Sequence, residues 1–300
     1  MNQTHQPDAQ TSPKANVQSK IAIFHALHAQ GCFVMPNAWD AGSARLLEAL
    51  GFQAIGSSGA GLAWSYGQSD GNLNLADVLR NAEELARAVN IPVNVDFENG
   101  FAEDERTLRN HIKALIQTGI AGFSLEDSLH PGQLPLRSPD EAARRIEWAR
   151  NVIEQAGTKT LLVGRAENFF SGDPNLDDVI LRLKHYANAG ADCVYAPGLR
   201  TREQIQTVVQ AVAPTPVNVL IGWETDLTVQ DLKDMGVRRI SVGGALARAA
   251  WKGFLEAARE IGTLGSFGGF ANTPSAADLH ALFDSVKVAT TDNLHTDDNQ

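Results

Sequence analysis

Residues 119–127 read Gly-Ile-Ala-Gly-Phe-Ser-Leu-Glu-Asp, a glycine followed by a short apolar segment that ends in two acids. Glycine readily adopts the left-handed conformation in which many helices end, so Gly119 marks the passage from a helix into a strand. An apolar run of this length is typical of a strand that is buried on both faces of a parallel sheet. The stretch therefore predicts one strand of a parallel α/β fold, with Glu126 and Asp127 at its carboxyl end.

The same arrangement recurs along the chain. A glycine precedes a strand-like segment at Gly51, Gly157, Gly190 and Gly236. Two echoing Pro-Val-Asn-Val runs at 92–95 and 216–219, and the run Cys-Phe-Val-Met-Pro-Asn-Ala at 32–38, add three more segments. Together these patterns predict eight strands, near residues 32, 54, 92, 122, 160, 193, 216 and 239.

Helical signals fill the gaps between these strands. Apolar residues recur at helical spacing at Leu108, Ile112, Leu115 and Ile116. Asp40 and Thr201 are candidate N-caps, and Ser138 opens a Ser-Pro-Asp-Glu capping box. Eight alternating β/α units in 300 residues favour a closed (β/α)₈ barrel of the TIM type over an open doubly wound sheet.

We expect a single domain over residues 20–288, made of the barrel and an extra C-terminal helix near Ser275–Val286. No strand follows that helix, so it is expected to pack across the barrel or, as a swapped helix, against a neighbouring subunit. Residues 1–19 and 289–300 are predicted to be disordered tails. The first of them is polar and lacks the apolar centre of a secretory signal.

Composition and charge exclude several kinds of partner. The net charge is −10 with the acids spread along the chain, which disfavours nucleic acid and anionic membranes. No stretch approaches the ~18 apolar residues that span a bilayer.

Only two cysteines occur, Cys32 and Cys193, and both are expected in the core. Such sparse cysteine indicates a reducing compartment and hence a cytoplasmic location.

Carboxylates gather at the ends of two adjacent predicted strands. Asp96 and Glu98 end the strand near residue 92, and Glu126 ends the strand near residue 122. Residues two apart in a strand point the same way, here toward the barrel mouth. Three neighbouring carboxylates ionise together at low cost only beside a cation, and their oxygens suit Mg²⁺ or Mn²⁺. The alternative is that they are solvated loop acids or partners of Arg106 and Arg165.

Arg165 ends the strand near residue 160 between apolar neighbours. A guanidinium there is suited to bind a substrate carboxylate through two parallel hydrogen bonds. The alternative is a structural ion pair with Glu167 or Glu98. The small residues 57–61 follow the strand near residue 54, where backbone N–H groups could approach a carboxylate or an enolate oxygen. A plain turn explains that glycine-rich run equally well.

The lysines and one histidine bear on the class of reaction. None of the lysines falls at the predicted carboxyl end of a strand, which disfavours a Schiff-base aldolase. His130 lies in a loop near the expected mouth of the barrel. It is either an acid or base on a closing loop or an ordinary solvated histidine.

The order of several segments resembles the phosphoenolpyruvate mutase/isocitrate lyase superfamily over roughly residues 20–262. They are Asn-Ala-Trp-Asp at 37–40, Gly-Ser-Ser-Gly-Ala-Gly at 56–61, Tyr-Gly-Gln-Ser-Asp-Gly at 66–71, Val-Asp-Phe-Glu-Asn-Gly-Phe at 95–101, Ser-Leu-Glu-Asp-Ser at 124–128, Gly-Arg-Ala-Glu-Asn-Phe-Phe at 164–170 and Gly-Val-Arg-Arg-Ile-Ser-Val-Gly-Gly-Ala-Leu-Ala-Arg-Ala-Ala-Trp at 236–251. The resemblance implies a barrel with a swapped C-terminal helix, a homodimer or homotetramer, and Mg²⁺. It also implies small 2-oxo or 2-hydroxy carboxylate substrates that pass through an enolpyruvate-like state.

The resemblance also implies a role for individual residues. Asp96 would bind the metal directly, Asp70, Glu98 and Glu126 would hold metal-bound waters, and Arg165 would grip the substrate carboxylate. The predicted metal site is thus Asp96, Glu98 and Glu126. The predicted catalytic residues are Asp70, Arg165 and His130. The predicted substrate-binding residues are Ser57, Ser58, Gly59, Ala60, Arg165 and Asn218.

Two departures from the superfamily pattern bear on the reaction. The second acid after the strand near residue 92 is usually aspartate, and here it is Glu98. Isocitrate and methylisocitrate lyases carry a Lys-x-Cys-Gly-His-type segment where residues 128–137 read Ser-Leu-His-Pro-Gly-Gln-Leu-Pro-Leu-Arg. Isocitrate-type cleavage is therefore disfavoured. The leading hypothesis is a Mg²⁺-dependent lyase that breaks a C–C bond in an oxaloacetate-like acid. The alternatives are P–C bond chemistry on a phosphonopyruvate-like substrate and a non-catalytic barrel that binds a keto acid.

Overall fold

The computed structural model describes residues 13–130 and 133–286. Residues 1–12, most of the predicted N-terminal tail, lie outside the described residues, and so does the predicted C-terminal tail. Helix α1 (Pro13–Ala29) begins seven residues before the expected domain boundary at residue 20. The N-terminal tail was therefore predicted too long. Proline is favoured in the first turn of a helix, where its missing N–H costs nothing.

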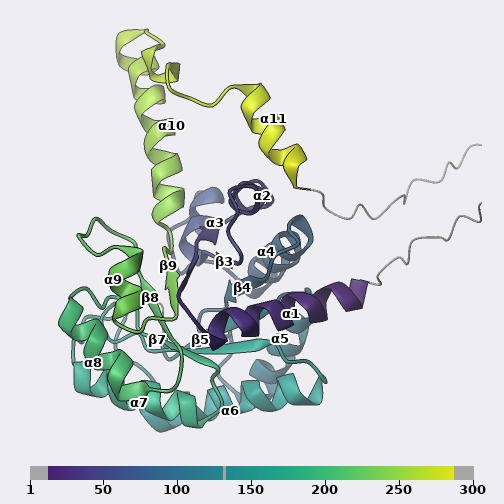
Figure 1. Ribbon diagram of the computed structural model, residues 1–300, viewed down its shortest axis with the longest axis vertical. Helices are drawn as coiled ribbons and strands as arrows, with labels where there is room; N and C mark the ends of the chain where they lie inside the picture. The colour runs from purple at the N-terminus through teal and green to yellow at the C-terminus, as the bar shows by residue number, and fades with distance from the viewer. Residues whose placement is uncertain (1–12, 131–132, 287–300) are drawn as a thin grey trace, which may run out of the picture.

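All strand pairs are parallel and form a closed ring (Figure 1). The strands are β1 (Phe33–Met35), β2 (Asn37–Ala38), β3 (Ile55–Ser57), β4 (Val93–Asp96), β5 (Gly122–Glu126), β6 (Leu161–Arg165), β7 (Cys193–Tyr195), β8 (Val217–Leu220) and β9 (Arg239–Ser241). β1 and β2 are halves of one strand on either side of Pro36, which has no N–H for the ladder. β1 pairs with β9 and β2 pairs with β3, so the split strand closes the barrel. The predicted (β/α)₈ barrel is confirmed.

Helices alternate with the strands, and most of them cover the outside of the barrel. They are α2 (Ala41–Ala49), α3 (Gly59–Ser65), α4 (Leu75–Ala88), α5 (Glu105–Gln117), α6 (Pro139–Gln155), α7 (Leu176–Asn188), α8 (Arg202–Val212), α9 (Val229–Asp234) and α10 (Ala245–Leu264). The glycines that were predicted to precede strands all have positive φ, at Gly51, Gly119, Gly157, Gly190 and Gly236. Asp40 and Thr201 are N-caps, as predicted, and each also forms a full capping box.

The predicted capping box at Ser138 is only half formed. The Ser138 side chain accepts a hydrogen bond from the Glu141 N–H at 3.3 Å. The Glu141 carboxylate instead accepts a bond of 2.8 Å from the Arg137 guanidinium. A charge-assisted bond to a guanidinium is stronger than one to a backbone N–H, so the carboxylate takes that partner.

Helix α1 lies across the amino-terminal end of the barrel. Ile21 and Phe24 are buried and pack with apolar residues of the barrel interior. The Phe24 ring comes so close to β5 that a Cβ at Gly122 would lie 2.8 Å from the ring carbon Cε1. The barrel is thus closed at this end. Cys193 is buried and Cys32 is half-buried, and both thiols are free.

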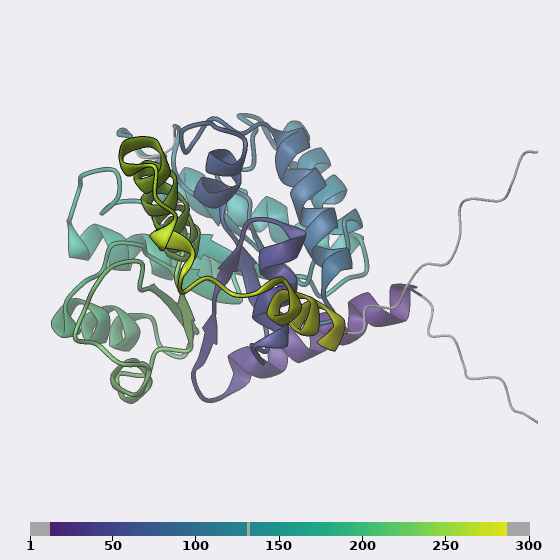
Figure 2. The same cartoon turned by 90° about the horizontal axis from the view of Figure 1, so that it is seen from above.

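The chain beyond the barrel forms an arm. α10 rises away from the barrel (Figures 1 and 2) and exposes apolar side chains such as Phe254, 61% exposed, and Leu264, 77% exposed. The extra C-terminal helix α11 (Ala276–Ser285) is confirmed and returns to pack against α2 of the same chain. The Arg45 guanidinium donates to the Phe283 carbonyl at 2.6 Å. The expected placement across the barrel is therefore wrong, and exchange of this helix with a second copy stays a prediction.

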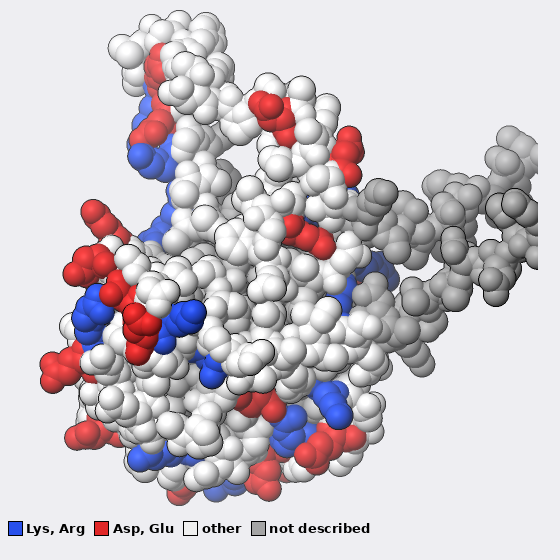
Figure 3. Space-filling view, viewed as in Figure 1, with Lys and Arg blue, Asp and Glu red and all other residues white. Residues whose placement is uncertain are grey.

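Surface charge is mixed. Basic and acidic side chains are interspersed over the visible face of the barrel and do not gather by sign (Figure 3). Within the part of the chain that the structure describes, no helix is both long enough and apolar enough to cross a membrane.

Candidate active site

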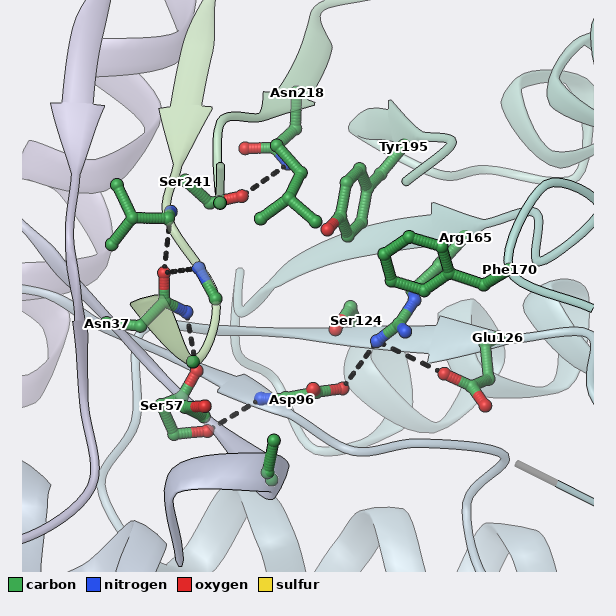
Figure 4. Close-up of a pocket in the computed structure, with 18 of the residues that line it drawn as sticks. Asn37, Ser57, Asp96, Ser124, Glu126, Arg165, Phe170, Tyr195, Asn218 and Ser241 are labelled. Carbon is green, nitrogen blue, oxygen red and sulfur yellow. Dashed lines mark hydrogen bonds and ion pairs between the residues drawn. The ribbon is translucent and has the colours of Figure 1, made fainter. Parts of the chain in front are cut away.

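A cavity of about 610 Å³ opens at the carboxyl ends of the strands (Figure 4). Nearly all of the predicted site residues line it, namely Ser57, Ser58, Gly59, Ala60, Asp70, Asp96, Glu98, Glu126, Arg165 and Asn218. The exception among the described residues is His130, which is exposed on the loop after β5 and does not line the cavity. The closure of parallel strands into a ring brings these residues together, since every strand then ends at the same mouth.

Five carboxylates form one side of the cavity, which we call the acidic wall. Its members are Asp70, Asp96, Glu98, Glu126 and Glu167. Arg165 stands at its centre: Nη1 lies 3.0 Å from Asp96 Oδ1 and 3.1 Å from Glu126 Oε2, and Nε lies 2.5 Å from Glu167 Oε1 (Figure 4 shows the first two). The predicted ion pair with Glu167 is therefore present. The described ion pairs of Arg165 do not include Glu98.

One guanidinium does not neutralise three acids, of which Glu126 and Glu167 are buried. Burial raises the pKa of Glu126 well above its ordinary value, even though Arg165 acts in the opposite direction. Burial likewise raises the pKa of Glu167 against the effect of Arg165. Burial disfavours the charge on Arg165, but Glu126, Glu167 and Asp96 outweigh it and raise the pKa of that guanidinium. The acidic wall holds more carboxyl groups than its arginine could balance if all of them were ionised.

Glu98 is the least satisfied member of the acidic wall. It is buried, and within the described chain its Oε1 atom has no hydrogen-bond partner. Burial, together with the charges of Asp96 and Asp70, raises the pKa of Glu98 to about 8. Its φ of 45° is in the left-handed region, a strained conformation of the kind often found at functional sites. A Cβ on Gly59 would lie 3.2 Å from Oε1, so glycine keeps the space beside this oxygen open.

These acids fit a water-coordinated cation better than a fully protein-ligated one. No three His, Cys, Asp or Glu side chains in the described ranges are placed to hold a metal ion by themselves. Mg²⁺ commonly takes one or two carboxylates and keeps several waters. The unpaired Glu98 oxygen and the excess of carboxyl groups over cations suit such an ion.

The serines after β3 have their own hydrogen bonds. The Ser57 hydroxyl accepts a bond of 2.8 Å from the Asp96 N–H, which holds the end of β4 in place. The Ser58 hydroxyl accepts from the Gly61 N–H at 3.1 Å and caps α3. Both side chains thus stabilise the chain locally, in agreement with the turn alternative, while Gly59 and Ala60 also line the cavity.

Asp70 reaches the cavity from the loop after α3. The residue is exposed, yet desolvation of its carboxyl and the nearby charge of Asp96 raise its pKa. A carboxyl with a raised pKa at the rim is available to a metal-bound water or to a proton transfer.

Sequence reasoning missed a set of polar residues that also line the cavity. They are Asn37, Asn94, Tyr195, Arg239 and Ser241. Asn94 and Asn218 occupy the same position in the two Pro-Val-Asn-Val segments. This repeat is the sequence feature that could have identified Asn94 as a lining residue. The signal for Arg239 was a charged residue inside an otherwise strand-like run.

Aromatic side chains surround the entrance. Trp64, Phe170 and Trp223 line the cavity. Phe169 instead packs against the turn at Gly198, where an added Cβ would lie 2.6 Å from the phenylalanine Cβ. The entrance therefore combines apolar rings with the charged groups below it.

Comparison with known proteins gives consistent results. A model of the phosphoenolpyruvate phosphomutase family matches residues 24–262. A protein of Corynebacterium glutamicum provisionally named 2-methylisocitrate lyase 2 is 29% identical over 264 residues, 85% of this chain and 84% of that protein. An oxaloacetate decarboxylase of Pseudomonas putida is 27% identical over 245 residues, 80% of this chain and 84% of that protein.

Solved structures agree. A protein from Burkholderia cenocepacia J2315, provisionally described as a lyase or mutase, is 37% identical with a TM-score of 0.86, over 90% of this chain and 98% of that one. Oxaloacetate acetylhydrolase in complex with its product oxalate is 26% identical with a TM-score of 0.77, over 89% of this chain and 94% of that one.

Proposed function

The chain belongs to the phosphoenolpyruvate phosphomutase family, and from this premise we propose that it is a Mg²⁺-dependent lyase that cleaves a C–C bond of a small oxaloacetate-like 2-oxo acid. The observation that carries the proposal is the excess of buried carboxylates around Arg165, with the Glu98 oxygen unpaired beside Asp96. Relatives named for reactions on oxaloacetate support the choice of substrate class.

Each residue of the acidic wall has a place in this scheme. Asp96 would hold the Mg²⁺ ion directly, and Asp70, Glu98 and Glu126 would orient its waters. When bound, the ion supplies Lewis-acid polarisation of the substrate C2 oxygen and stabilises the negative charge that develops there. The raised pKa of Glu98, about 8, means that this carboxyl must lose a proton before it can accept hydrogen bonds from such waters through both oxygens.

Arg165 would bind the substrate carboxylate. Its Nη1 now contacts Asp96 and Glu126 at 3.0 and 3.1 Å. A divalent cation at Asp96 would take over the neutralisation of these acids, so that Nη1 could donate to the substrate. Nε would remain on Glu167, which fixes the plane of the guanidinium.

Two other reactions of the superfamily have less support. P–C chemistry needs cationic or hydrogen-bonding groups for a phosphoryl dianion, and the candidates on the loop after β5 are His130, Gln133 and Arg137. The Arg137 side chain is buried and paired with Glu103 and Glu141, while His130 is exposed away from the cavity lining. Isocitrate-type cleavage is not proposed because residues 128–137 contain no cysteine or lysine.

An NMR turnover screen tests the proposal. The purified protein with Mg²⁺ would be offered oxaloacetate, phosphonopyruvate, isocitrate, methylisocitrate and 2-oxoglutarate, and the screen repeated with excess chelator. We expect chelator-sensitive loss of oxaloacetate above its spontaneous decay, and the products would distinguish decarboxylation from hydrolysis. Consumption of phosphonopyruvate instead would favour P–C chemistry. Binding of a keto acid without any turnover would favour a non-catalytic role.

We also propose that the protein acts as a homodimer or homotetramer. The apolar side chains on the α10 arm and the turn after it are exposed, among them Phe254, Leu264 and Phe267. A second copy that carries the same surface would bury them symmetrically. Light scattering of the purified chain would give the mass, and a monomer at micromolar concentration would contradict this proposal.

A further inference from the structure

Arg239 is a buried cation that the proposed reaction does not use. It begins β9 and lines the cavity, and only 1% of the residue is exposed. Among the described residues it forms no ion pair with a carboxylate. A buried charge without a counter-charge is costly, and such groups are rare unless they have a function.

The partners of Arg239 are neutral. Its Nε donates to Asn218 Oδ1 at 2.8 Å, a good hydrogen bond. Its Nη1 has two longer contacts of 3.4 Å, to Asn94 Oδ1 and His28 Nε2. The Nδ1 atom of His28 lies 2.8 Å from the Phe24 carbonyl, and donation of its proton there leaves Nε2 as an acceptor. We call Asn94, Asn218 and Ser241, together with Arg239, the amide wall.

The electrostatic effects on His28 and Arg239 agree with the absence of a counter-charge among the described residues. Burial, followed by the positive charge of Arg239, lowers the pKa of His28 to about 3, so the imidazole is neutral at physiological pH. Burial also lowers the pKa of Arg239 itself, and no carboxylate counteracts it. Asparagine at 94 and 218 supplies acceptor oxygens but leaves the guanidinium charge free for a mobile anion.

Uncharged groups lie between the amide wall and Arg165. Asn218 Nδ2 donates to the Ser241 hydroxyl at 3.0 Å (Figure 4). Burial raises the pKa of the Tyr195 hydroxyl, although Arg165 and Ser241 act in the opposite direction, so this group is neutral at physiological pH. The Arg165 guanidinium lies over the Tyr195 ring, 5.5 Å from its centroid. Two cations therefore face one cavity, and the groups between them are uncharged.

The remaining cations of the cavity differ from Arg239. Arg200 and Arg248 are exposed at the entrance. Arg200 lies 4.5 Å from the centroid of the Trp223 ring, and Arg248 donates to the Gly222 carbonyl. Solvent already screens and hydrates these groups, whereas at Arg239 an anion would meet a charge in a site of low dielectric constant.

We propose that the amide wall is the binding subsite for a second carboxylate of the ligand, with Arg239 as its counter-charge and Asn94 and Asn218 as flanking amides. This deepens the proposed function, on which it rests only for the placement of the first carboxylate at Arg165. The site then selects 2-oxo dicarboxylates over 2-oxo monocarboxylates of the same chain length.

Calorimetric titration with matched ligand pairs tests this without any turnover. The four-carbon pair is 3,3-difluorooxaloacetate and 2-oxobutyrate, and the five-carbon pair is 2-oxoglutarate and 2-oxopentanoate. In the wild-type protein we expect the dicarboxylate of at least one pair to bind about tenfold tighter or more, since a hydrogen-bonded buried charge pair is worth at least that. Because no reaction is needed, failure of the lyase proposal would not hide the result.

Four variants test which residues produce the preference for the dicarboxylate over the monocarboxylate. Arg239→Gln should abolish it, and Arg239→Lys, which keeps the charge, should retain part of it. Asn218→Asp should weaken it by giving Arg239 a permanent internal carboxylate. Arg238→Gln is the matched control, because Arg238 does not line the cavity in the described structure. It should leave the preference unchanged.

A stability measurement separates this role from a structural one. If the role of Arg239 is to bind a ligand carboxylate, Arg239→Gln should keep or raise the Tm of the protein, because the substitution removes an uncompensated charge. The proposal is overturned if neither dicarboxylate binds tighter than its monocarboxylate, or if Arg239→Gln retains the preference. Should that variant fail to fold, an undiminished preference in Asn218→Asp would overturn it equally.

Discussion

Arg165 and Arg239 are largely buried guanidinium groups of the same cavity, but they stand in opposite surroundings. Arg165 contacts three carboxylates within 3.1 Å, whereas Arg239 contacts two amides and an imidazole. The acidic wall holds more carboxyl groups than its arginine can balance, whereas the described residues of the amide wall offer Arg239 no carboxylate. The difference indicates that the cavity is built to receive a cation on one side and an anion on the other.

The largest expected effect comes from removing the direct cation ligand of the acidic wall. Asp96→Ala should lower kcat/KM for oxaloacetate by about a thousandfold or more, because the polarising ion is lost. Steady-state kinetics and calorimetry with Mg²⁺ would measure both losses. Asp234→Ala, a change of an exposed acid on α9, is the control. Full activity in Asp96→Ala would refute the metal site.

The next largest effect is a difference in unfolding free energy between variants of the two arginines. Arg165→Gln leaves Glu126 and Glu167 buried without a counter-charge and should lower the free energy of unfolding by about 3 kcal/mol. Arg239→Gln should not lower it. Urea unfolding of both variants at neutral pH, without metal or ligand, makes the comparison. Equal destabilisation would show that both arginines are structural.

A smaller effect depends on pH and concerns His28, which contacts Arg239 of the amide wall. Its pKa is about 3 in the fold and 6.5 in the unfolded chain, because burial and Arg239 oppose its charge. Between these values the unfolded chain binds the extra proton, so stability is lost as pH falls below 6.5, by up to roughly 1.4 kcal/mol per pH unit.

His28→Asn should remove that contribution. We expect the difference in unfolding free energy between variant and wild type to move in favour of the variant as pH falls below 6.5. Denaturant titrations at a series of pH values would measure it. If the unfolding free energies of wild type and His28→Asn changed with pH in the same way, His28 would titrate normally and Arg239 would have no influence on it.

The smallest effect lies outside both walls and calibrates the others. Thr201→Ala removes the side-chain bond to the Gln204 N–H, 3.2 Å long, at the start of α8. It should cost about 1 kcal/mol of stability. Turnover and the dicarboxylate preference should not change. If they did, loss of stability alone would account for part of the effects seen at the walls.

Much of the fold was predictable because its signals are local. A glycine at the end of a helix and an apolar strand after it recur throughout, and each such glycine has positive φ. The start of α1 and the break at Pro36 were missed. Both depend on packing and closure: Phe24 fills the barrel end beside Gly122, and the two halves of the first strand pair with different neighbours.

The acidic wall was predictable for a related reason. In a parallel barrel, acids at strand ends must share one mouth, so Asp96 and Glu126 could be placed together from their positions in the chain alone. His130 satisfied the same sequence criterion, but the structure places it on the exposed side of its loop. The sequence does not determine which way a loop side chain turns.

The barrel, the strand ends and the acids that meet there can be derived from the sequence, since they follow from chain periodicity and from the common direction of the strands. Which charges are compensated depends on contacts that form only in the folded barrel. Arg239 and Asn94 are 145 residues apart and meet only inside the closed barrel. Whether a buried charge has a counter-charge depends on groups from every strand around it, and that is a property of the closed ring.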